Sequence, residues 1–198
     1  MFVTFEGVDG AGKTTQVELL ASHLREAGRE VVVTREPGGT ALGERVRDLL
    51  LRGEDMSAWA EAALFTAARA ELVAEVIAPA LERGAWVVCD RYVDSSLAYQ
   101  GIARGLGVDA VLELNTQPTN ALLPDRTYVL LVGEAESARR VGSDGDRIER
   151  EGGDFRTRVA DAYRELAARF PERIVALDGT LPPEDVARAV REDLAAHV

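Results

Sequence analysis

Gly7-Val8-Asp9-Gly10-Ala11-Gly12-Lys13-Thr14 is the most informative segment of this sequence. It matches the pattern G-x-x-x-x-G-K-[ST] without a gap. The glycines allow a tight turn whose backbone N–H groups point toward one anion, and they remove Cβ atoms that would block its approach. Lys13 adds a mobile ammonium group, and the Thr14 hydroxyl can ligate a magnesium ion. All eight residues are therefore predicted to form a phosphate-binding loop.

The residues on either side of this loop support the same interpretation. Before it, Phe2-Val3-Thr4-Phe5 has the pattern of an apolar strand. After it, apolar side chains recur at helical spacing until Gly28, a typical helix stop. A helix that begins at Lys13 directs its positive dipole end toward the same anion. The alternative is an ordinary glycine-rich turn, but the agreement of strand, loop and helix favours a nucleotide-phosphate site.

The composition restricts the class of protein. A chain of 198 residues with 46% hydrophobic and 29% charged residues suits one globular domain, expected over residues 1–198. The net charge of -11 argues against a general nucleic-acid surface. The single cysteine, Cys89, excludes an internal disulfide. No apolar run approaches a membrane span and no signal segment is visible, so we expect a cytoplasmic protein without membrane or nucleic-acid partners.

Five apolar segments predict strands, at about 2–6, 31–34, 86–89, 127–132 and 174–177. Helical patterns separate them, which indicates an α/β fold with a doubly wound, five-stranded parallel sheet and helices on both faces. Pro182-Pro183 marks the start of the last helix. On the helix after residue 40, we expect one core face formed by Leu42, Val46, Leu49 and Leu50. Residues 141–153 are rich in glycine and charge and are predicted to form a mobile lid.

Polar segments follow the second strand. Thr34-Arg35-Glu36-Pro37-Gly38-Gly39-Thr40 comes directly after it. Because the carboxyl ends of parallel strands line the ligand crevice, we expect this loop to face bound phosphates. The alternative is a rigid turn with no further role. On the next helix, Arg47 could reach a phosphate or could be a solvated arginine.

Candidate ligand-binding residues also follow the third strand. Asp90 stands where P-loop proteins hold magnesium or its waters, and Arg91 offers a forked donor for phosphate oxygens. The alternative for both is a salt bridge at the end of the strand. Phe65 and Arg69 lie four residues apart, on one face of a predicted helix. They suit a nucleobase, through ring stacking and a bond to a base carbonyl, although such a pair is commonly core plus surface.

Taken together, these segments resemble the thymidylate kinase family of P-loop nucleoside monophosphate kinases. The most specific match is Arg35 to Thr40 followed by Ala98-Tyr99-Gln100-Gly101. Three more segments match in the family's order. Two of them, Leu64 to Arg69 and Asp90-Arg91-Tyr92, lie between the first pair, and Asp146-Arg147-Ile148-Glu149 comes after it. The resemblance covers nearly the whole chain. It implies transfer of the γ-phosphoryl group of MgATP to dTMP in dTTP synthesis, and it implies a homodimer.

The resemblance also implies roles for individual residues. Phe65 would stack on thymine and Arg69 would bond its carbonyl, while Arg47 and Arg91 would hold the acceptor phosphate. Asp9 would bond the sugar 3′-hydroxyl. The dTMP site would be completed by Tyr99, which crowds the sugar 2′ position, and by Glu36, Pro37, Ser96 and Gln100. ATP would bind the loop from Gly7 to Thr14. Magnesium would be held by Thr14 and Asp90, directly or through water.

The family divides by the position of its catalytic arginine. Gly10 stands where one class carries that arginine, so this chain resembles the class with arginines in the lid. Arg147 is then expected to act with Lys13, Arg91 and Asp9, and the further candidates are Arg139, Arg140 and Arg150. The alternative for Arg147 is a surface pair with Glu149. The sequence departs from the family at Leu131, where an acidic residue is usual.

Two other functions remain open from the sequence. The chain could be a kinase of another nucleoside monophosphate, which Phe65, Arg69 and the segment Ala98 to Gly101 argue against. It could also be a nucleotide-binding regulatory protein without transfer chemistry. The combination of Lys13, Thr14, Asp90 and Arg147 argues against that alternative, since a sensor needs no lid arginine.

Overall fold

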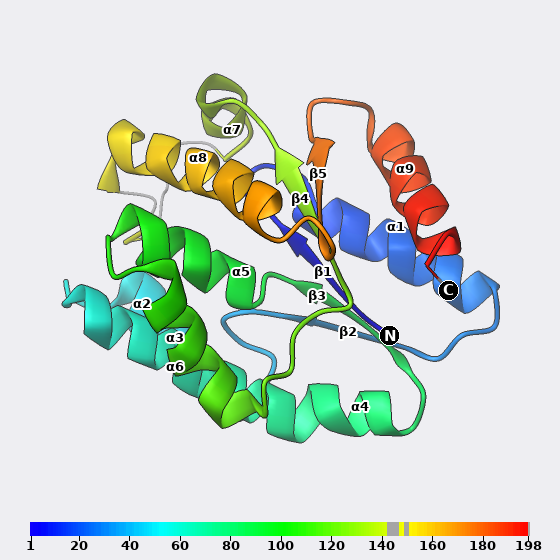
Figure 1. Cartoon of the computed structure of the whole chain (residues 1–198), viewed down its shortest axis with the longest axis horizontal. Helices are drawn as coiled ribbons and strands as arrows, with labels where there is room; N and C mark the ends of the chain where they lie inside the picture. Colours follow the sequence, from blue (N-terminus) through cyan, green and yellow to red (C-terminus); the bar gives the residue numbers. More distant parts are fainter. Residues whose placement is uncertain (142–146, 149–150, 198) are drawn as a thin grey trace.

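A computed structural model describes residues 1–141, 147–148 and 151–197 of the chain. Its centre is a five-stranded parallel sheet in the order β2-β3-β1-β4-β5 (Figure 1). The strands are β1 (Phe2–Glu6), β2 (Val31–Arg35), β3 (Trp86–Asp90), β4 (Arg126–Leu131) and β5 (Ile174–Asp178). The glycine-rich loop follows β1, the middle strand, where the chain order of the strands reverses. Ligand crevices of open α/β sheets lie at such points, so the fold places the loop there.

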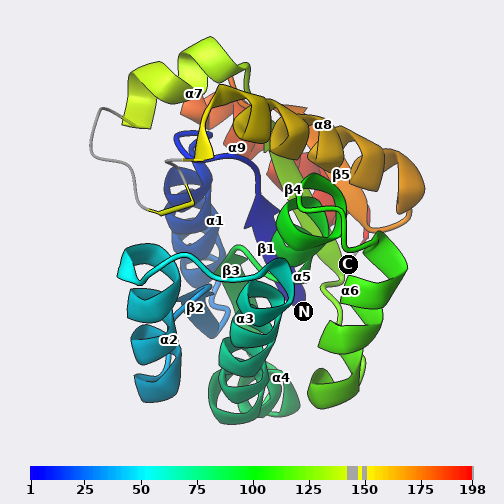
Figure 2. The same cartoon turned by 90° about the vertical axis from the view of Figure 1, so that its left-hand side faces the viewer.

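Helices cover both faces of the sheet. On one face α1 (Lys13–Glu26) packs against α9 (Pro183–Ala195), as Figure 1 shows. The elements of the opposite side are α3 (Ala58–Leu72), α4 (Ala78–Glu82), α5 (Val93–Ser96), α6 (Val108–Thr116) and α8 (Gly153–Arg169). Figure 2 shows α2 (Ala41–Arg52) beside α3, and α7 (Glu134–Val141) next to α8. A π-helical stretch, Val73–Ile77, joins α3 to α4, another, Leu97–Ala103, follows α5, and a short 3₁₀ turn, Gln117–Thr119, follows α6.

The core has one large cluster on each face of the sheet, and a third, small cluster of Val46, Leu50 and Ala68 lies between α2 and α3. On β3, Val88 packs into the cluster with α1 and α9, whereas its neighbours Val87 and Cys89 belong to the cluster on the other face. Strands buried on both faces read as continuous apolar runs, which is the pattern seen in the sequence. Burial of each such side chain contributes about 1.5–3 kcal/mol. The doubly wound α/β fold expected from the sequence is confirmed.

The structure confirms most of the expected elements and corrects one helix face. Each of the five strands begins and ends within one residue of its predicted limits, and α1 and α9 begin at Lys13 and Pro183. The expected core face of α2 is wrong at Leu42 and Leu49, which are 43% and 54% exposed, whereas Val46 and Leu50 are buried. The reason is that α2 packs against α3 rather than directly on the sheet, so that only the narrow row of α2 side chains that face α3 is buried.

Two sequence predictions, the single domain and the lid, are not tested by the structure. The description of residues 1–198 as one domain stays a prediction. Of the predicted lid over 141–153, residues 142–146 and 149–150 lie outside the described part of the structure, and with them Asp146, Glu149 and Arg150. Among the helices that the structure describes, none has the length and apolar character needed to cross a bilayer.

Candidate active site

The phosphate-binding loop has the backbone that its glycines predict. Gly7, Gly10 and Gly12 have positive φ values of 134°, 73° and 96°. A Cβ atom on Gly7 would lie 2.6 Å from the carbonyl oxygen of Leu130, so only glycine fits there. Gly12 precedes the first turn of α1, whose free N–H groups face the loop. The local sequence therefore builds an anion cradle at the carboxyl end of β1.

The side chain of Lys13 folds back over this loop. Its Nζ donates to the carbonyl oxygens of Val8, at 3.0 Å, and Gly7, at 3.2 Å, and it lies 3.8 Å from Oδ1 of Asp9. Burial lowers the pKa of Lys13 to about 8, and repulsion by Arg91 acts in the same direction. The ammonium group thus rests on weak carbonyl partners that phosphate oxygens can replace.

Thr14 and Asp90 meet beside the loop. Oγ1 of Thr14 donates to Oδ2 of Asp90 at 2.8 Å, because β1 and β3 pair in parallel with Phe5 opposite Asp90. The described residues hold no cluster of three or more His, Cys, Asp or Glu that could form a metal cage. A hydroxyl and a single carboxylate still suit Mg²⁺, which binds few protein oxygens and keeps waters and phosphate oxygens. The pair fits the predicted metal site.

A cavity of about 580 Å³ opens over the loop. Besides Asp9 to Gln16, its lining includes Arg140, a predicted lid candidate, and four residues for which the sequence predicted no ligand contact: Gly179, Leu181, Pro183 and Val186. Arg140 comes from α7, Gly179 and Leu181 come from the connection between β5 and α9, and Pro183 and Val186 come from the first turn of α9. The sequence could have indicated these residues only through the place of β5 in the sheet. Because β5 is parallel to β1 and β3, the residues that follow it lie at the same edge as the loop. Pro182-Pro183 was interpreted only as a helix start.

Arg91 stands at the carboxyl end of β3 in a left-handed conformation, with a φ of 69°. Its Nη2 donates to Oδ1 of Asp9 at 2.6 Å, and its Nη1 donates to Oγ of Ser95 and to the hydroxyl of Tyr163, at 3.2 and 3.3 Å. Burial opposes ionisation of Asp9, but the charges of Arg91 and Lys13 outweigh it and lower the pKa of Asp9 to about 2. Arg91 is therefore a fixed cation next to the loop.

Glu6, which was not predicted from the sequence, forms hydrogen bonds that hold the residues around Arg91 in place. It is the last residue of β1 and is fully buried. Its carboxylate accepts from the backbone N–H of Tyr92 at 2.7 Å, from Oγ of Ser95 at 2.6 Å and from the hydroxyl of Tyr163 at 2.9 Å. Burial raises its pKa above the usual value. These bonds hold the turn at Arg91 and connect it to α8.

A second, smaller recess of about 90 Å³ lies next to the first cavity. Its lining includes the predicted nucleobase and sugar residues Phe65, Ser96, Tyr99 and Gln100, together with Pro37, Leu51, Ser95 and Ile148. Four charged residues line both spaces: Asp9, Glu36, Arg47 and Arg91. Arg47 donates through Nη1 to the carbonyl oxygen of Pro37 at 3.0 Å. The two spaces share one charged wall.

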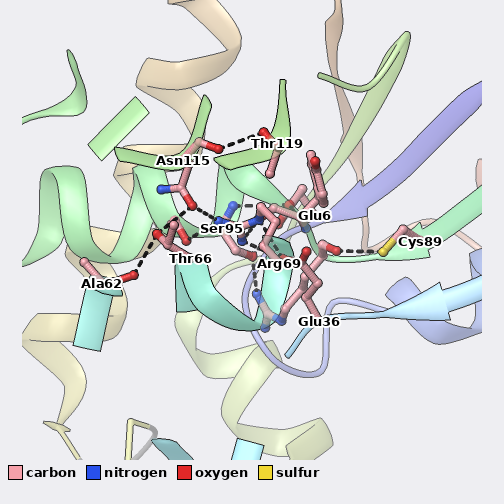
Figure 3. Close-up of polar contacts among 12 residues, drawn as sticks. Glu6, Glu36, Ala62, Thr66, Arg69, Cys89, Ser95, Asn115 and Thr119 are labelled. Atoms are coloured by element: carbon pink, nitrogen blue, oxygen red, sulfur yellow. Dashed lines mark hydrogen bonds and ion pairs between the residues drawn. The ribbon is translucent and has the colours of Figure 1, made fainter. Parts of the chain in front are cut away.

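Arg69 lies behind this recess rather than in its lining. It is 1% exposed, and its guanidinium donates to Oε2 of Glu36 and to Oδ1 of Asn115 (Figure 3). It also donates to Oγ of Ser96 and to the carbonyl oxygen of Tyr92. These bonds use all five of its N–H groups. Direct contact with a base carbonyl stays a prediction, and it requires one of these groups to change partner.

Arg147 also lies away from the loop. It is 5% exposed, and its Nε donates to the carbonyl oxygen of Leu50 at 2.8 Å while its Nη2 donates to Oε2 of Glu61 at 2.6 Å. Among the other described candidates, Arg140 is nearest the loop, since its Nη1 donates to the carbonyl oxygens of Gly10 and Gly179. Arg139 is exposed and pairs with Glu136.

A P-loop after the middle strand of a parallel sheet defines the chain as a P-loop NTPase. A second recess that shares two arginines with the loop cavity is the arrangement of a phosphotransferase. Residues 5–190 match the family model "Thymidylate kinase". The chain is 51% identical over 199 residues to the thymidylate kinase of Bifidobacterium longum (strain NCC 2705), covering 98% of this chain and 97% of that one. The chain belongs to the thymidylate kinase family.

Two further relatives agree. The chain is 54% identical over 192 residues to the thymidylate kinase of Thermomicrobium roseum, covering 96% of this chain and 91% of that one. The crystal structure of thymidylate kinase from Ehrlichia chaffeensis has a TM-score of 0.81 and 35% identity, over 98% of both chains. Members of the family are ATP-dependent phosphotransferases, and the chain is accordingly a kinase.

Proposed function

We propose that the chain transfers the γ-phosphoryl group of ATP to dTMP, which gives dTDP and ADP for dTTP synthesis. The observation that carries this proposal is the wall shared by the two spaces, formed by Asp9, Glu36, Arg47 and Arg91. Phosphoryl transfer needs donor and acceptor phosphates in line and surrounded by positive charge. A loop cavity and a recess that meet at two arginines provide that arrangement.

On the donor side, the loop from Gly7 to Thr14 binds the ATP phosphates, and Lys13 moves from its carbonyl partners to the outer phosphates. The base of ATP is proposed to lie against Arg140, Gly179 and Leu181, which line the same cavity as the loop. Thr14 and Asp90 would hold Mg²⁺. When bound, the ion supplies charge neutralisation at the phosphates.

On the acceptor side, Arg47 and Arg91 bind the phosphate of dTMP, Asp9 accepts a bond from the 3′-hydroxyl, and Phe65 stacks on the base. Tyr99 crowds the sugar 2′ position, with Glu36, Pro37, Ser96, Gln100 and Arg69 around the rest of the nucleotide. No general base is required, since an acceptor phosphate oxygen is already anionic. Catalysis then rests on position and on charge stabilisation.

Arg147 is proposed as the arginine that stabilises the transferring phosphoryl group, as the lid-arginine class implies. Its contacts with Leu50 and Glu61 then describe a resting position. The guanidinium must leave both partners before it can reach the phosphates.

A steady-state assay with ATP and dTMP, dUMP, UMP and dCMP as acceptors tests the proposed reaction. We expect the highest kcat/KM for dTMP. A higher value for any other acceptor would assign the chain to a different nucleoside monophosphate, and no turnover with any of them would remove the transfer function.

The base and sugar contacts have their own test. Phe65→Ala is expected to weaken dTMP binding by about 1–3 kcal/mol, the usual contribution of a base stacked on an aromatic ring. Tyr99→Ala is expected to narrow the kcat/KM ratio of dUMP to UMP, because it removes a clash with the 2′-hydroxyl. If both variants keep the parent's binding and ratio, the nucleotide lies elsewhere.

The homodimer implied by the family is also a proposal. Its support is an apolar surface on α3 and α6, where Trp59 is 51% exposed and lies near Ala110, Leu114 and Pro118. The expected cytoplasmic location and the expected absence of membrane and nucleic-acid partners stay predictions.

A further inference from the structure

Glu61 is a buried carboxylate at the centre of a polar cluster beside the smaller recess. It is fully buried on α3, one turn before Phe65. It accepts from Nε2 of Gln100 at 2.8 Å, from Nε and Nη2 of Arg104 at 3.0 and 2.9 Å, and from Nη2 of Arg147 at 2.6 Å. Burial opposes its ionisation, but these hydrogen bonds hold the pKa of Glu61 below its usual value. The group is therefore an ionised acceptor.

The contact with Gln100 fixes which end of its amide faces the recess. An ionised carboxylate can only accept, so the amide must turn its NH₂ group toward Glu61. The carbonyl oxygen, Oε1, occupies the opposite end of the planar group. Gln100 and Phe65 both line the recess. Among the described residues, no donor forms a hydrogen bond with Oε1 of Gln100, and this oxygen is not one of the fully buried polar atoms that lack a partner. Oε1 of Gln100 is therefore left as a hydrogen-bond acceptor for a ligand in the recess.

We propose that Glu61 is a specificity-determining residue that acts through Gln100 and selects acceptor bases with an N–H group at N3. Thymine and uracil carry a donor at N3, whereas cytosine carries a lone pair there, which would face the Oε1 lone pairs. The proposal rests on the proposed function and names its substrate class, nucleoside monophosphates of pyrimidine-2,4-diones. It does not separate dTMP from dUMP, because both carry the same donor.

The test is the ratio of kcat/KM for dTMP to that for dCMP. In Glu61→Gln the partner of Gln100 can accept or donate, so the Gln100 amide can turn over and present NH₂ to cytosine. We expect the ratio to fall by about 10-fold or more, the scale of one mismatched buried hydrogen bond. Gln100→Leu, which leaves Glu61 with both arginines, should lower the ratio as well. Adding Glu61→Gln to Gln100→Leu should then change it no further.

Arg104→Gln is the matched control, since it removes another partner of Glu61 and keeps the contact with Gln100. Its ratio should equal the parent's. The inference is overturned if Glu61→Gln, folded by its melting transition, keeps the parent's ratio within twofold. It is also overturned if Gln100→Leu keeps that ratio, or if Arg104→Gln lowers it as much as Glu61→Gln does. If the parent itself prefers dCMP, the proposed function fails instead.

Discussion

At the scale of single residues, the site is built from buried charged side chains that are held by hydrogen bonds. A buried charge is costly unless it is paired and hydrogen-bonded, so each of these groups depends on named partners. Glu6 holds the turn at Arg91, Glu36 pairs with Arg69, and Glu61 pairs with Arg147. Such pairs hold side chains in one geometry before any nucleotide binds.

The depressed pKa of Lys13 predicts a pH dependence of ATP use. The kcat/KM for ATP reports the ionisations of the free enzyme, in which Lys13 has a pKa of about 8. Above that pH the amine is neutral and attracts phosphate less. We expect kcat/KM for ATP to fall toward a tenfold loss per pH unit above about pH 8, measured by initial rates from pH 6 to 10.

Two variants check that Lys13 causes this loss. Lys13→Arg keeps its charge throughout the range and should lack the alkaline decline, whatever its overall rate. Lys13→Ala should stay folded and lose at least about 100-fold in turnover, the scale for one charge-stabilising donor. A parent profile that is flat to pH 10, or near-normal turnover in folded Lys13→Ala, would contradict the assignment.

Glu36 makes stability depend on pH. Burial raises its pKa from 4.5 to about 7, against the opposing charge of Arg69, and its Oε1 has no described partner. Between these two values the folded chain binds a proton that the unfolded chain has released. The contribution of Glu36 to the free energy of unfolding therefore falls as the pH rises from about 4.5 to about 7, by about 1–3 kcal/mol.

Glu36→Gln, which cannot titrate, gives the comparison. Urea unfolding at pH 4.5 and pH 7.5 should show that the parent's decrease in stability over this interval exceeds the variant's. Equal pH dependence in the two proteins would place the pKa of Glu36 near its ordinary value.

At the scale of elements, the sequence predicts what depends on local pattern and misses what depends on neighbours. The five strands are apolar runs between turn signals, and the loop at Gly7 carries its own chemistry, so both could be predicted. The exposure of Leu42 and Leu49 depends on where α2 lies, which its own periodicity does not contain. The burial of Glu6 and Glu61 likewise depends on segments far away in the chain. The placement of Arg147 on α2 and α3 could not be derived from the surrounding glycines and charges.

Arg147→Ala tests whether its contacts with these helices are only structural. As the arginine of the transition state it should lower kcat by about 10³-fold and raise either KM much less. Loss of its bonds to Leu50 and Glu61 should also lower the free energy of unfolding by about 1–3 kcal/mol. Single-turnover rates and urea unfolding measure the two effects separately.

Arg147→Lys should recover only part of the rate, because an ammonium lacks the planar fork. If Arg147→Ala loses stability but keeps kcat within a few-fold of the parent, the role is structural. The search for the catalytic arginine would then move to Arg140, Arg139 and Arg150, beginning with Arg140, which already contacts the loop.

At the scale of the whole molecule, the two cavities lie at one end of the sheet, and large apolar side chains are exposed on the helices beside it. The two cavities open where the parallel strands end. The helices α2, α3 and α6 lie side by side (Figures 1 and 2), and α2 and α3 also contribute Arg47 and Phe65 to the walls of these cavities. These helices carry three of the large exposed hydrophobic side chains among the described residues: Leu42 and Leu49 on α2, and Trp59 on α3. Exposed apolar groups on one face commonly mark an interface.

The proposed homodimer should therefore depend on Trp59. In a twofold dimer each contact occurs twice, so one substitution places two charges in the interface. We expect the parent chain to sediment as a dimer at micromolar concentration and Trp59→Glu to sediment as a folded monomer. Val33→Glu is the matched control, because Val33 is similarly exposed, at 44%, but lies on the edge strand β2. A monomeric parent would exclude the homodimer. A dimeric Trp59→Glu would move the interface from α3, and dissociation by Val33→Glu alone would place it at the edge of the sheet.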